Sequence, residues 1–183
     1  MTTKDEVKAL WKLCFKDSDE FTDLYFKMRY KDEINRVVRE DGKIVSALQM
    51  IPYPMTFCGG VIPTSYISGA CTHPDYRKHG AMRRLLKETH RRMYEEGILL
   101  ASLIPAEEWL FGYYAKSGYV PAFGYAVEQV RRNGLHLSAG CRVEVCESPG
   151  AEHYLYFDSR MRGRRSCILH SHEDFLVVMA DLS

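Results

Sequence analysis

The chain has 183 residues, a length that fits one ordinary domain and leaves room for the beginning of a second. Apolar residues make up 46% of it, enough to bury a core, which excludes an intrinsically disordered chain. The 25 Lys and Arg residues stand against 24 Asp and Glu residues, which excludes the strongly basic bias of a general nucleic-acid binder. Any anion-binding site must therefore be local.

The N-terminal stretch MTTKDEVKALWKLCF is charged and has the pattern of a helix, and no apolar run of membrane-spanning length follows it. We therefore expect a soluble, unsecreted, cytoplasmic protein without membrane or nucleic-acid partners. The cysteines show no CxxC spacing, which in a reducing cytosol favours small buried hydrophobic residues over a disulfide or zinc role. There are six: Cys14, Cys58, Cys71, Cys141, Cys146 and Cys167.

Two amphipathic helices are expected at the start of the chain, because apolar residues recur at spacings of three and four. Thr3 with Glu6 is a candidate capping box for the first helix. The apolar faces consist of Val7, Leu10, Trp11, Cys14 and Phe15 in the first helix, and of Phe21, Leu24, Tyr25 and Met28 in the second.

Three β-rich runs follow these helices. The first two, residues 33–40 and 43–57, are joined across Asp41-Gly42, a strong signal for a two-residue hairpin turn. Gly59-Gly60 is predicted to be a second hairpin turn, before a third run at residues 61–72.

Gly69, inside the third run, indicates a bulge or a close approach of the backbone by another group. After it, residues 72–86, THPDYRKHGAMRRLL, lead from a turn into a helix that Gly97 ends. One face of this helix is apolar, and its cations lie elsewhere on it. The apolar face consists of Met82, Leu85, Leu86, Thr89 and Met93.

The next elements complete an α/β order. Residues 98–104, ILLASLI, form a continuous apolar run that predicts a buried strand, followed by a helix over residues 107–116 that Gly118 ends. Residues 119–130 are predicted to be a further strand. The order helix, helix, three antiparallel strands, helix, strand, helix, strand predicts a mixed, mostly antiparallel α/β sandwich and not a doubly wound sheet.

Beyond residue 130 we expect a connector at 131–140, a short strand at 141–147 and a short helix within 148–163. Ser171 is a candidate cap for a final helix, which treats His170-Ser171-His172 as a helix start and not as a metal site. The chain stops while this helix is still apolar, so we expect that a second lobe is missing.

The turn at Arg77-Lys78-His79-Gly80 has the chemistry of a pyrophosphate site. A loop that passes from a strand into a helix points backbone N–H groups at one spot, where the helix N-terminus adds partial positive charge. Gly80 allows close backbone approach, and Arg77 and Lys78 add charge-assisted contacts. Neither GxxxxGK[ST] nor GxGxxG is present. The alternative is a solvated basic helix face without a ligand.

The succession of a Gly-marked strand, THPDYRKHGAMRRLL, a buried strand and YYAKSGY resembles the Gcn5-related N-acetyltransferase (GNAT) superfamily over about residues 3–130. The resemblance implies an acetyl-coenzyme A domain at residues 1–130. It implies that the Arg-x-x-Gly-x-Gly/Ala loop grips the cofactor pyrophosphate, with Met82 standing where the family usually has Gly or Ala. The matching residues are Arg77, Lys78, His79, Gly80, Ala81 and Met82.

Within that superfamily, residues 41–86 are most similar to the enhanced-intracellular-survival (Eis) type of acetyltransferase. Chains of that type continue into a second acetyltransferase-like lobe and a sterol-carrier-like lobe. Residues 154–169, YLYFDSRMRGRRSCIL, resemble the beginning of that second lobe, which implies that residues 131–183 are a connector and its start.

The resemblance also implies roles in catalysis. The strand residues Ala70, Cys71 and Thr72 are expected to line the pantetheine arm and to lend a backbone N–H to the thioester carbonyl. Tyr114 is the expected general acid, since a phenol with a pKa of about 10 can protonate a leaving thiolate. The alternatives are that Cys71 is only a small buried residue and that Tyr114, with Tyr113, only packs a helix face.

The general base is not identifiable from the sequence. The candidates, each also explained as a solvated or capping group, are His73, Glu107, Glu108 and Glu128. In the Eis type the base is taken to be the C-terminal carboxylate of a longer chain.

The sequence analysis thus predicts an acetyl-coenzyme A-dependent N-acetyltransferase that acts on a primary amine. The acceptor is a protein lysine, an aminoglycoside or a small amine, and homo-oligomerisation is left open. The rival hypothesis is a catalytically silent coenzyme A-binding or interaction module.

Overall fold

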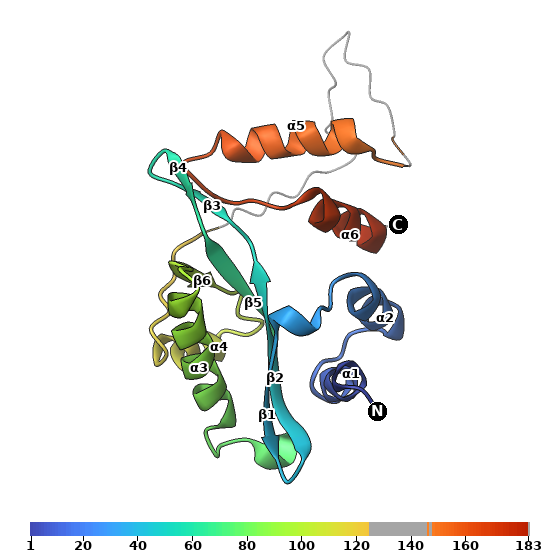
Figure 1. The fold of residues 1–183 in the computed structure, drawn as a ribbon, viewed down its shortest axis with the longest axis vertical. Helices are drawn as coiled ribbons and strands as arrows, with labels where there is room; N and C mark the ends of the chain where they lie inside the picture. The colour runs from blue at the N-terminus through green and yellow to red at the C-terminus, as the bar shows by residue number, and fades with distance from the viewer. Residues whose placement is uncertain (125–145, 147, 183) are drawn as a thin grey trace.

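The computed structural model describes residues 1–124, 146 and 148–182. Its centre is a four-stranded sheet in the order β1-β2-β5-β6, in which only β5 and β6 run parallel. Helices α1 and α2 cover one face of this sheet, and α3 and α4 lie on the other (Figure 1). The predicted mixed, mostly antiparallel α/β architecture is therefore confirmed.

The two N-terminal helices are α1 (Thr3–Cys14) and α2 (Asp19–Met28), as the apolar spacing predicts. The capping box is one residue earlier than expected: Thr2 caps α1, and Asp5 completes the box. The Thr2 side chain accepts from the Asp5 N–H at 3.2 Å, and the Asp5 carboxylate accepts from the Thr2 N–H at 2.9 Å. The predicted Thr3–Glu6 box is wrong because the chain is already helical at Thr3.

The first hairpin forms as predicted. Strands β1 (Asn35–Glu40) and β2 (Lys43–Pro52) pair antiparallel across Asp41 and Gly42, whose φ angles of 50° and 78° are those of a type I′ turn. A short 3₁₀ helix, η1 (Asp32–Ile34), leads into β1.

Proline residues divide the next two predicted runs. The run predicted at residues 43–57 breaks after Pro52 into β2 and β3 (Met55–Phe57), and the run at 61–72 breaks at Pro63 into β4 (Gly60–Ile62) and β5 (Thr64–Thr72). Proline lacks the N–H that a strand ladder needs, so the chain leaves the main sheet at these points. Strands β3 and β4 belong to a second sheet, and the turn between them is at Cys58 and Gly59, one residue before the predicted Gly59-Gly60.

Gly69 is both the bulge and the close approach that the sequence indicates. Opposite Leu48 of β2, strand β5 carries the two residues Gly69 and Ala70 between paired positions. The φ of Gly69 is +59°, and a Cβ there would lie 2.1 Å from Cζ3 of Trp11 on α1. Only glycine therefore fits between the bulge and the indole ring.

The second half of the main domain contains α3 (Ala81–Glu95), β6 (Leu100–Ser102) and α4 (Trp109–Ala115). The buried face of α3 is the predicted one, with Ala81 added at its start. Strand β6 is not buried as predicted: it is an edge strand in the described part of the chain, and Leu100 is 45% exposed. The strand predicted at residues 119–130 is absent over 119–124, and 125–130 lie outside the described residues.

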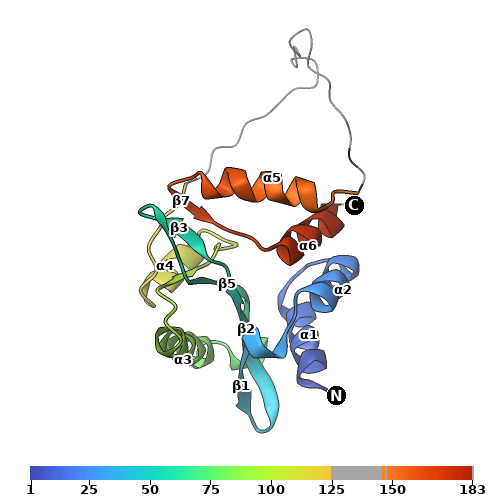
Figure 2. The same cartoon turned by 45° about the horizontal axis from the view of Figure 1, so that its top comes forward.

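The C-terminal segment contains α5 (Ala151–Arg162), β7 (Ser166–Ile168) and α6 (His172–Leu182). Both helices are predicted, and Ser171 caps α6 by accepting from the Asp174 N–H at 3.1 Å. Strand β7 is not predicted; it pairs with β3 and extends the second sheet to the order β4-β3-β7. Helix α6 lies near α2, and α5 extends above both sheets (Figure 2). The connector 131–140 and the strand 141–147, which includes Cys141, lie outside the described residues, apart from residue 146.

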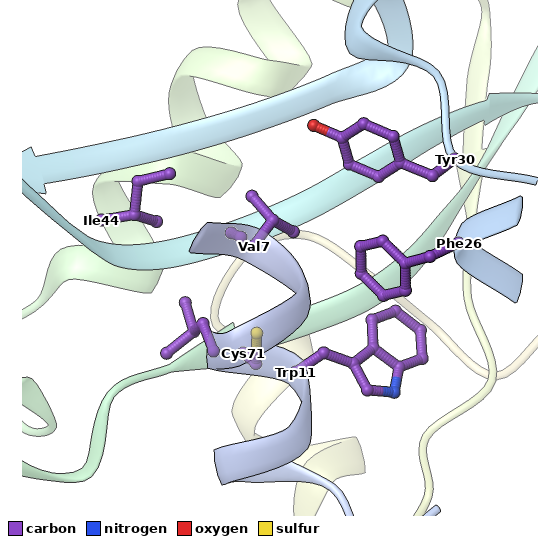
Figure 3. Packing of buried hydrophobic residues seen from close by; sticks show 8 residues of the cluster. Val7, Trp11, Phe26, Tyr30, Ile44 and Cys71 are labelled. Carbon is purple, nitrogen blue, oxygen red and sulfur yellow. The ribbon is translucent and has the colours of Figure 1, made fainter. Parts of the chain in front are cut away.

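Two hydrophobic clusters divide along the main sheet. One lies under α1 and α2 and is rich in aromatic rings (Figure 3), while the other lies under α3. The first contains Val7, Leu10, Trp11, Phe26, Tyr30, Ile44, Ala47 and Cys71, and the second contains Leu48, Met50, Ile67, Met82, Leu85, Leu86 and Met93. Neighbouring residues of β2 and β5 thus face opposite helices, as strand alternation requires.

The cysteines differ from one another more than expected. Cys71 is buried and Cys14 and Cys167 are partly buried, but Cys58 and Cys146 are exposed, so the prediction of small buried residues is wrong for these two. None of the helices in the described ranges is long and apolar enough to span a membrane.

Candidate active site

The candidate site begins where strands β5 and β6 separate. Strand β5 pairs with β2 up to Thr72, but on its other edge it pairs with β6 only from Thr64 to Tyr66. Within the described residues, the stretch 67–72 therefore has no neighbouring strand on this edge. Its backbone groups can bind an extended ligand that carries amides, as a sheet edge binds an added strand.

The predicted residues Ala70, Cys71 and Thr72 lie on this unpaired stretch, and their side chains are occupied elsewhere. Ala70 packs on the α3 cluster, and Cys71, which is 6% exposed, belongs to the α1 cluster. The Thr72 hydroxyl lies 2.7 Å from Ser46 Oγ. Only the backbone of this stretch is therefore left for a ligand.

The predicted phosphate loop connects this edge to α3. A 3₁₀ helix, η2 (Pro74–Tyr76), turns the chain, and Arg77 then folds back so that its Nε donates to the Thr72 carbonyl at 3.1 Å. Lys78 and Gly80 have φ angles of 66° and 81°, and Lys78 and His79 are exposed. A Cβ at Gly80 would meet no atom within 4 Å, so glycine is favoured there by the backbone angle and not by crowding.

The N-terminus of α3 has no side-chain cap. The first N–H groups of a helix have no partner within it and carry its partial positive charge, so they favour an anion. The side chains of Ala81 and Met82 are 2% and 9% exposed and point into the core, which leaves only their backbone at the loop. The Met82 side chain therefore does not fill the loop. Arg84, one turn later, binds Glu40 at 2.8 Å instead.

Tyr114 lies on α4, half-buried against the cluster that contains Met82. Its ring centroid is 5.3 Å from that of Tyr113 and 5.7 Å from that of Tyr119. Burial raises the pKa of the Tyr114 phenol above 10, with smaller electrostatic contributions from Tyr113, Tyr66 and Cys71. The phenol is therefore protonated at neutral pH and can donate a proton.

No general base emerges from the described residues. Glu107 and Glu108 are exposed beside α4, and Glu107 accepts from the Trp109 indole N–H. His73 caps η2, since its Nδ1 accepts from the Asp75 N–H at 3.3 Å. Glu128 lies outside the described residues.

The structure also reveals polar groups that the sequence analysis missed. The Tyr25 hydroxyl lies 2.8 Å from Gln49 Oε1 and 2.9 Å from Ser68 Oγ, under α2 beside the bulge. Burial raises the pKa of Tyr25 to about 12. The sequence feature that could have indicated this polar group is Gln49, a polar residue inside the apolar run IVSALQMI. On the α3 side, His90 Nε2 lies 2.8 Å from the Tyr119 hydroxyl.

A third missed group is formed by Cys14, Cys71 and Arg77. The Cys14 sulfur lies 3.3 Å from the Thr72 carbonyl oxygen, which is also the acceptor of Arg77. Nothing in the local sequence signals this group, because Cys14 belongs to α1 and the other two follow far along the chain.

Comparison with known proteins identifies the fold. A family model described as an acetyltransferase (GNAT) domain matches residues 2–122. The structure of a GCN5-related N-acetyltransferase from Anabaena variabilis is similar with a TM-score of 0.54 and 25% identity, covering 60% of this chain and 28% of that chain. The structure of Eis1 from Mycobacterium abscessus is similar with a TM-score of 0.51 and 11% identity, and the match covers 61% of this chain and 28% of the Eis1 chain.

A smaller relative is covered almost entirely. The structure of AAC(6')-Iy in complex with the bisubstrate analogue CoA-S-monomethyl-acetylneamine is similar with a TM-score of 0.55 and 14% identity, covering 70% of this chain and 91% of that chain. By contrast, this chain spans less than a third of the Anabaena variabilis and Eis1 structures. No curated protein matches it.

Proposed function

This chain belongs to the Gcn5-related N-acetyltransferase (GNAT) family, and on that premise we propose that it transfers an acetyl group from acetyl-coenzyme A to a primary amine. The observation that carries the proposal is the β5 edge at residues 67–72, which has no neighbouring strand among the described residues and leads through the loop into the uncapped N-terminus of α3. Amides of the pantetheine arm fit the former, and a pyrophosphate fits the latter.

We assign the donor site to three groups of residues. The backbone of Ala70, Cys71 and Thr72 binds the pantetheine arm and donates to the thioester carbonyl. Arg77 and Lys78 contribute cationic side chains to the pyrophosphate, and the backbone at residues 79–82 contributes N–H groups. What supports this assignment is that each of these backbones lies on the edge or at the helix end described above.

Tyr114 is the proposed general acid. The neutral amine attacks the thioester carbonyl and a C–N bond forms, the C–S bond breaks, and the departing thiolate takes the phenolic proton. The nitrogen then releases its extra proton to solvent, and the phenolate takes one back. The raised pKa supports this role, because the acid form persists through neutral pH. The amine itself must lose a proton before attack, since an alkyl ammonium has a pKa of about 10. The residue that removes it is not assigned.

The finer organisation is also a proposal. We propose an Eis-like organisation, in which residues 131–183 connect the domain to a second lobe. What supports it is the sequence likeness of residues 41–86 and 154–169, together with the 28% share of the Eis1 chain that this chain covers. The acceptor class, whether a protein lysine, an aminoglycoside or a small amine, is open under this proposal.

Thermal unfolding with acetyl-coenzyme A, beside ATP and NAD, tests the binding step. A ligand at 100 times its dissociation constant stabilises a folded protein by about 2.7 kcal/mol, which for a chain of this size shifts Tm by roughly 5–10 °C. We expect this shift with acetyl-coenzyme A alone among the three. An unchanged Tm with acetyl-coenzyme A would remove the proposed function.

Release of free thiol with a panel of amines tests the chemical step. In Tyr114→Phe we expect kcat to fall by a factor of about 10²–10⁴, whereas Tyr113→Phe, the neighbouring buried phenol, is the matched control and stays within about twofold. Because burial raises the Tyr114 pKa, loss of its proton should cause no decline in kcat below about pH 9. Binding of acetyl-coenzyme A without thiol release from any amine would instead support a silent coenzyme A-binding module.

A further inference from the structure

Two thiols, those of Cys14 and Cys71, lie at the base of the proposed phosphate loop. Cys14 is the last residue of α1, partly buried, and Cys71 is a buried residue of β5 whose side chain points toward α1 (Figure 3). The Cys14 sulfur lies 3.3 Å from the carbonyl oxygen of Thr72, the residue that follows Cys71, and Cys14 packs against the cluster that contains Cys71. A disulfide needs sulfur atoms that can approach to about 2.05 Å, and two cysteines that pack into one cluster between a helix and a strand can meet that condition.

The surroundings of the two thiols make them unequal. The Cys14 sulfur and Arg77 Nε share one acceptor, the Thr72 carbonyl oxygen, at 3.3 Å and 3.1 Å, so the guanidinium lies beside the sulfur. The hydrogen bond from Cys71, followed by that from Arg77, lowers the pKa of Cys14, whereas the hydrogen bond to Cys14, followed by burial, raises the pKa of Cys71. The first proton therefore leaves Cys14, and Cys71 keeps its own. Such a cationic, partly open environment is typical of reactive cysteines.

We propose that Cys14 is a peroxide-reactive modification site and that Cys71 is its resolving thiol. The Cys14 thiolate attacks one oxygen of hydrogen peroxide, so an S–O bond forms, the O–O bond breaks and hydroxide leaves, which takes up a proton to become water. The Cys71 sulfur then attacks Cys14, the S–S bond forms, the S–O bond breaks and a second water leaves with the Cys71 proton. Two thiols lose two electrons, and the peroxide is reduced to two waters.

The site is coupled to the loop through Arg77. When the Cys14 thiolate lies beside Arg77, its negative charge neutralises part of the positive charge of the guanidinium. A pyrophosphate on the loop competes for the same guanidinium, so bound acetyl-coenzyme A raises the pKa of Cys14 and slows its reaction. This coupling rests on the proposed function, whereas the thiol chemistry does not.

Alkylation of the reduced protein at pH 6.5 tests the thiolate. An ordinary thiol with a pKa near 8.5 is then only about 1% ionised. Exposed Cys58, in the turn between β3 and β4, is the internal control. We expect iodoacetamide to label Cys14 at least fivefold faster than Cys58, although Cys14 is less exposed, and we expect Arg77→Ala to remove most of that advantage. Equal rates, or faster labelling of Cys58, would overturn the proposal.

Peroxide treatment followed by peptide mass mapping tests the resolving thiol. We expect the wild-type protein to lose two hydrogen atoms in a peptide pair that joins Cys14 to Cys71. In Cys71→Ala, which keeps a small apolar side chain in the cluster, a dimedone adduct should instead form on Cys14. Oxidation that begins at Cys58 or Cys146, or a disulfide between two molecules, contradicts the assignment.

Acetyl-coenzyme A in the same labelling reaction separates this proposal from the proposed function. Slower labelling of Cys14 with unchanged labelling of Cys58 supports the coupling. If the Tm shift shows binding and Cys14 labelling is unaffected, the coupling through Arg77 is wrong. If no Tm shift occurs but the Cys14–Cys71 disulfide forms, the proposed function fails and the modification site stands.

Discussion

Helices α1 and α3 lie on opposite faces of one sheet, and their N-termini are built in opposite ways. The N-terminus of α1 is closed by the Thr2–Asp5 capping box. Helix α2 is capped by Ser18 and α6 by Ser171. Helix α3, with 15 residues, begins at Ala81 after Gly80, which has a left-handed conformation, and it has no side-chain cap. A capped helix end contributes stability, whereas an uncapped one beside cationic side chains is available to an anion.

The packing of the two helices shows the same contrast. On the α1 face, the Trp11 ring fills the space over Gly69, and the ring centroid of Tyr25 lies 4.6 Å from that of Trp11. On the α3 face, the cluster under the helix ends at the edge of β5 that has no neighbour among the described residues. One face is closed by aromatic packing, and the other is open where a ligand would lie.

The largest loss of stability is expected when a side chain is added at Gly69, under the Trp11 ring of α1. Gly69→Ala places a Cβ within 2.1 Å of a Trp11 carbon, so the indole or the strand must move. We expect a loss of about 3 kcal/mol in the free energy of unfolding, a Tm lower by roughly 6–12 °C. Gly42→Ala is the matched control, because its φ of +78° carries the same backbone strain while nothing lies within 4 Å, and it should cost about 1 kcal/mol. Equal losses in thermal unfolding would mean that Trp11 does not constrain β5.

The next effect tests the open end of α3. In Gly80→Asp a carboxylate lies at the uncapped N-terminus, where it favours the helix but repels a phosphate. We expect the Kd for acetyl-coenzyme A to rise at least tenfold, about 1.4 kcal/mol, while the positive φ at residue 80 lowers the free energy of unfolding by about 1 kcal/mol. Gly97→Asp is the control at the other end of α3, where φ is +73°, and it should leave Kd unchanged. If both variants bind equally well by calorimetry, the phosphate lies elsewhere.

The smallest effect tests the closed end of α1. Thr2→Ala removes the cap and should lower the free energy of unfolding by about 1 kcal/mol without changing the Kd for acetyl-coenzyme A. Thr3→Ala is the control, since Thr3 is where the sequence pattern placed the cap and the structure places none. Denaturant unfolding measures both variants. A larger loss in Thr3→Ala than in Thr2→Ala would restore the cap predicted from the sequence.

Much of the candidate site could be predicted because its parts are adjacent in sequence. Residues Arg77 to Met82 form one continuous loop and helix start, so their adjacency in the sequence is enough to predict that they lie close together. The apolar face of α3 followed from its periodicity, and Asp41-Gly42 followed from turn chemistry. These features depend on neighbours within about one helical turn or one hairpin.

The rest of the fold depends on which strands lie side by side and in which register, and no local sequence pattern contains that information. Whether β6 is buried depends on what lies beside it, and the apolar run 98–104 has the same pattern whether it is a central or an edge strand. The pairing of β7 with β3 likewise joins segments more than a hundred positions apart. Such contacts are decided when whole elements pack.

The amino-acid sequence by itself determined the helices, the first hairpin, the glycine at the bulge and the loop that leads into α3, because each is specified by residues a few positions apart. The tertiary structure alone decided that Trp11 is the group that approaches Gly69 and that Cys14 and Arg77 meet at the Thr72 carbonyl, beside Cys71. It also decided that, in the described part of the chain, residues 67–72 of β5 have a partner strand on one edge only. The physical reason is that side-chain contacts between distant segments follow from the register and curvature of the sheet, which only the packed chain defines.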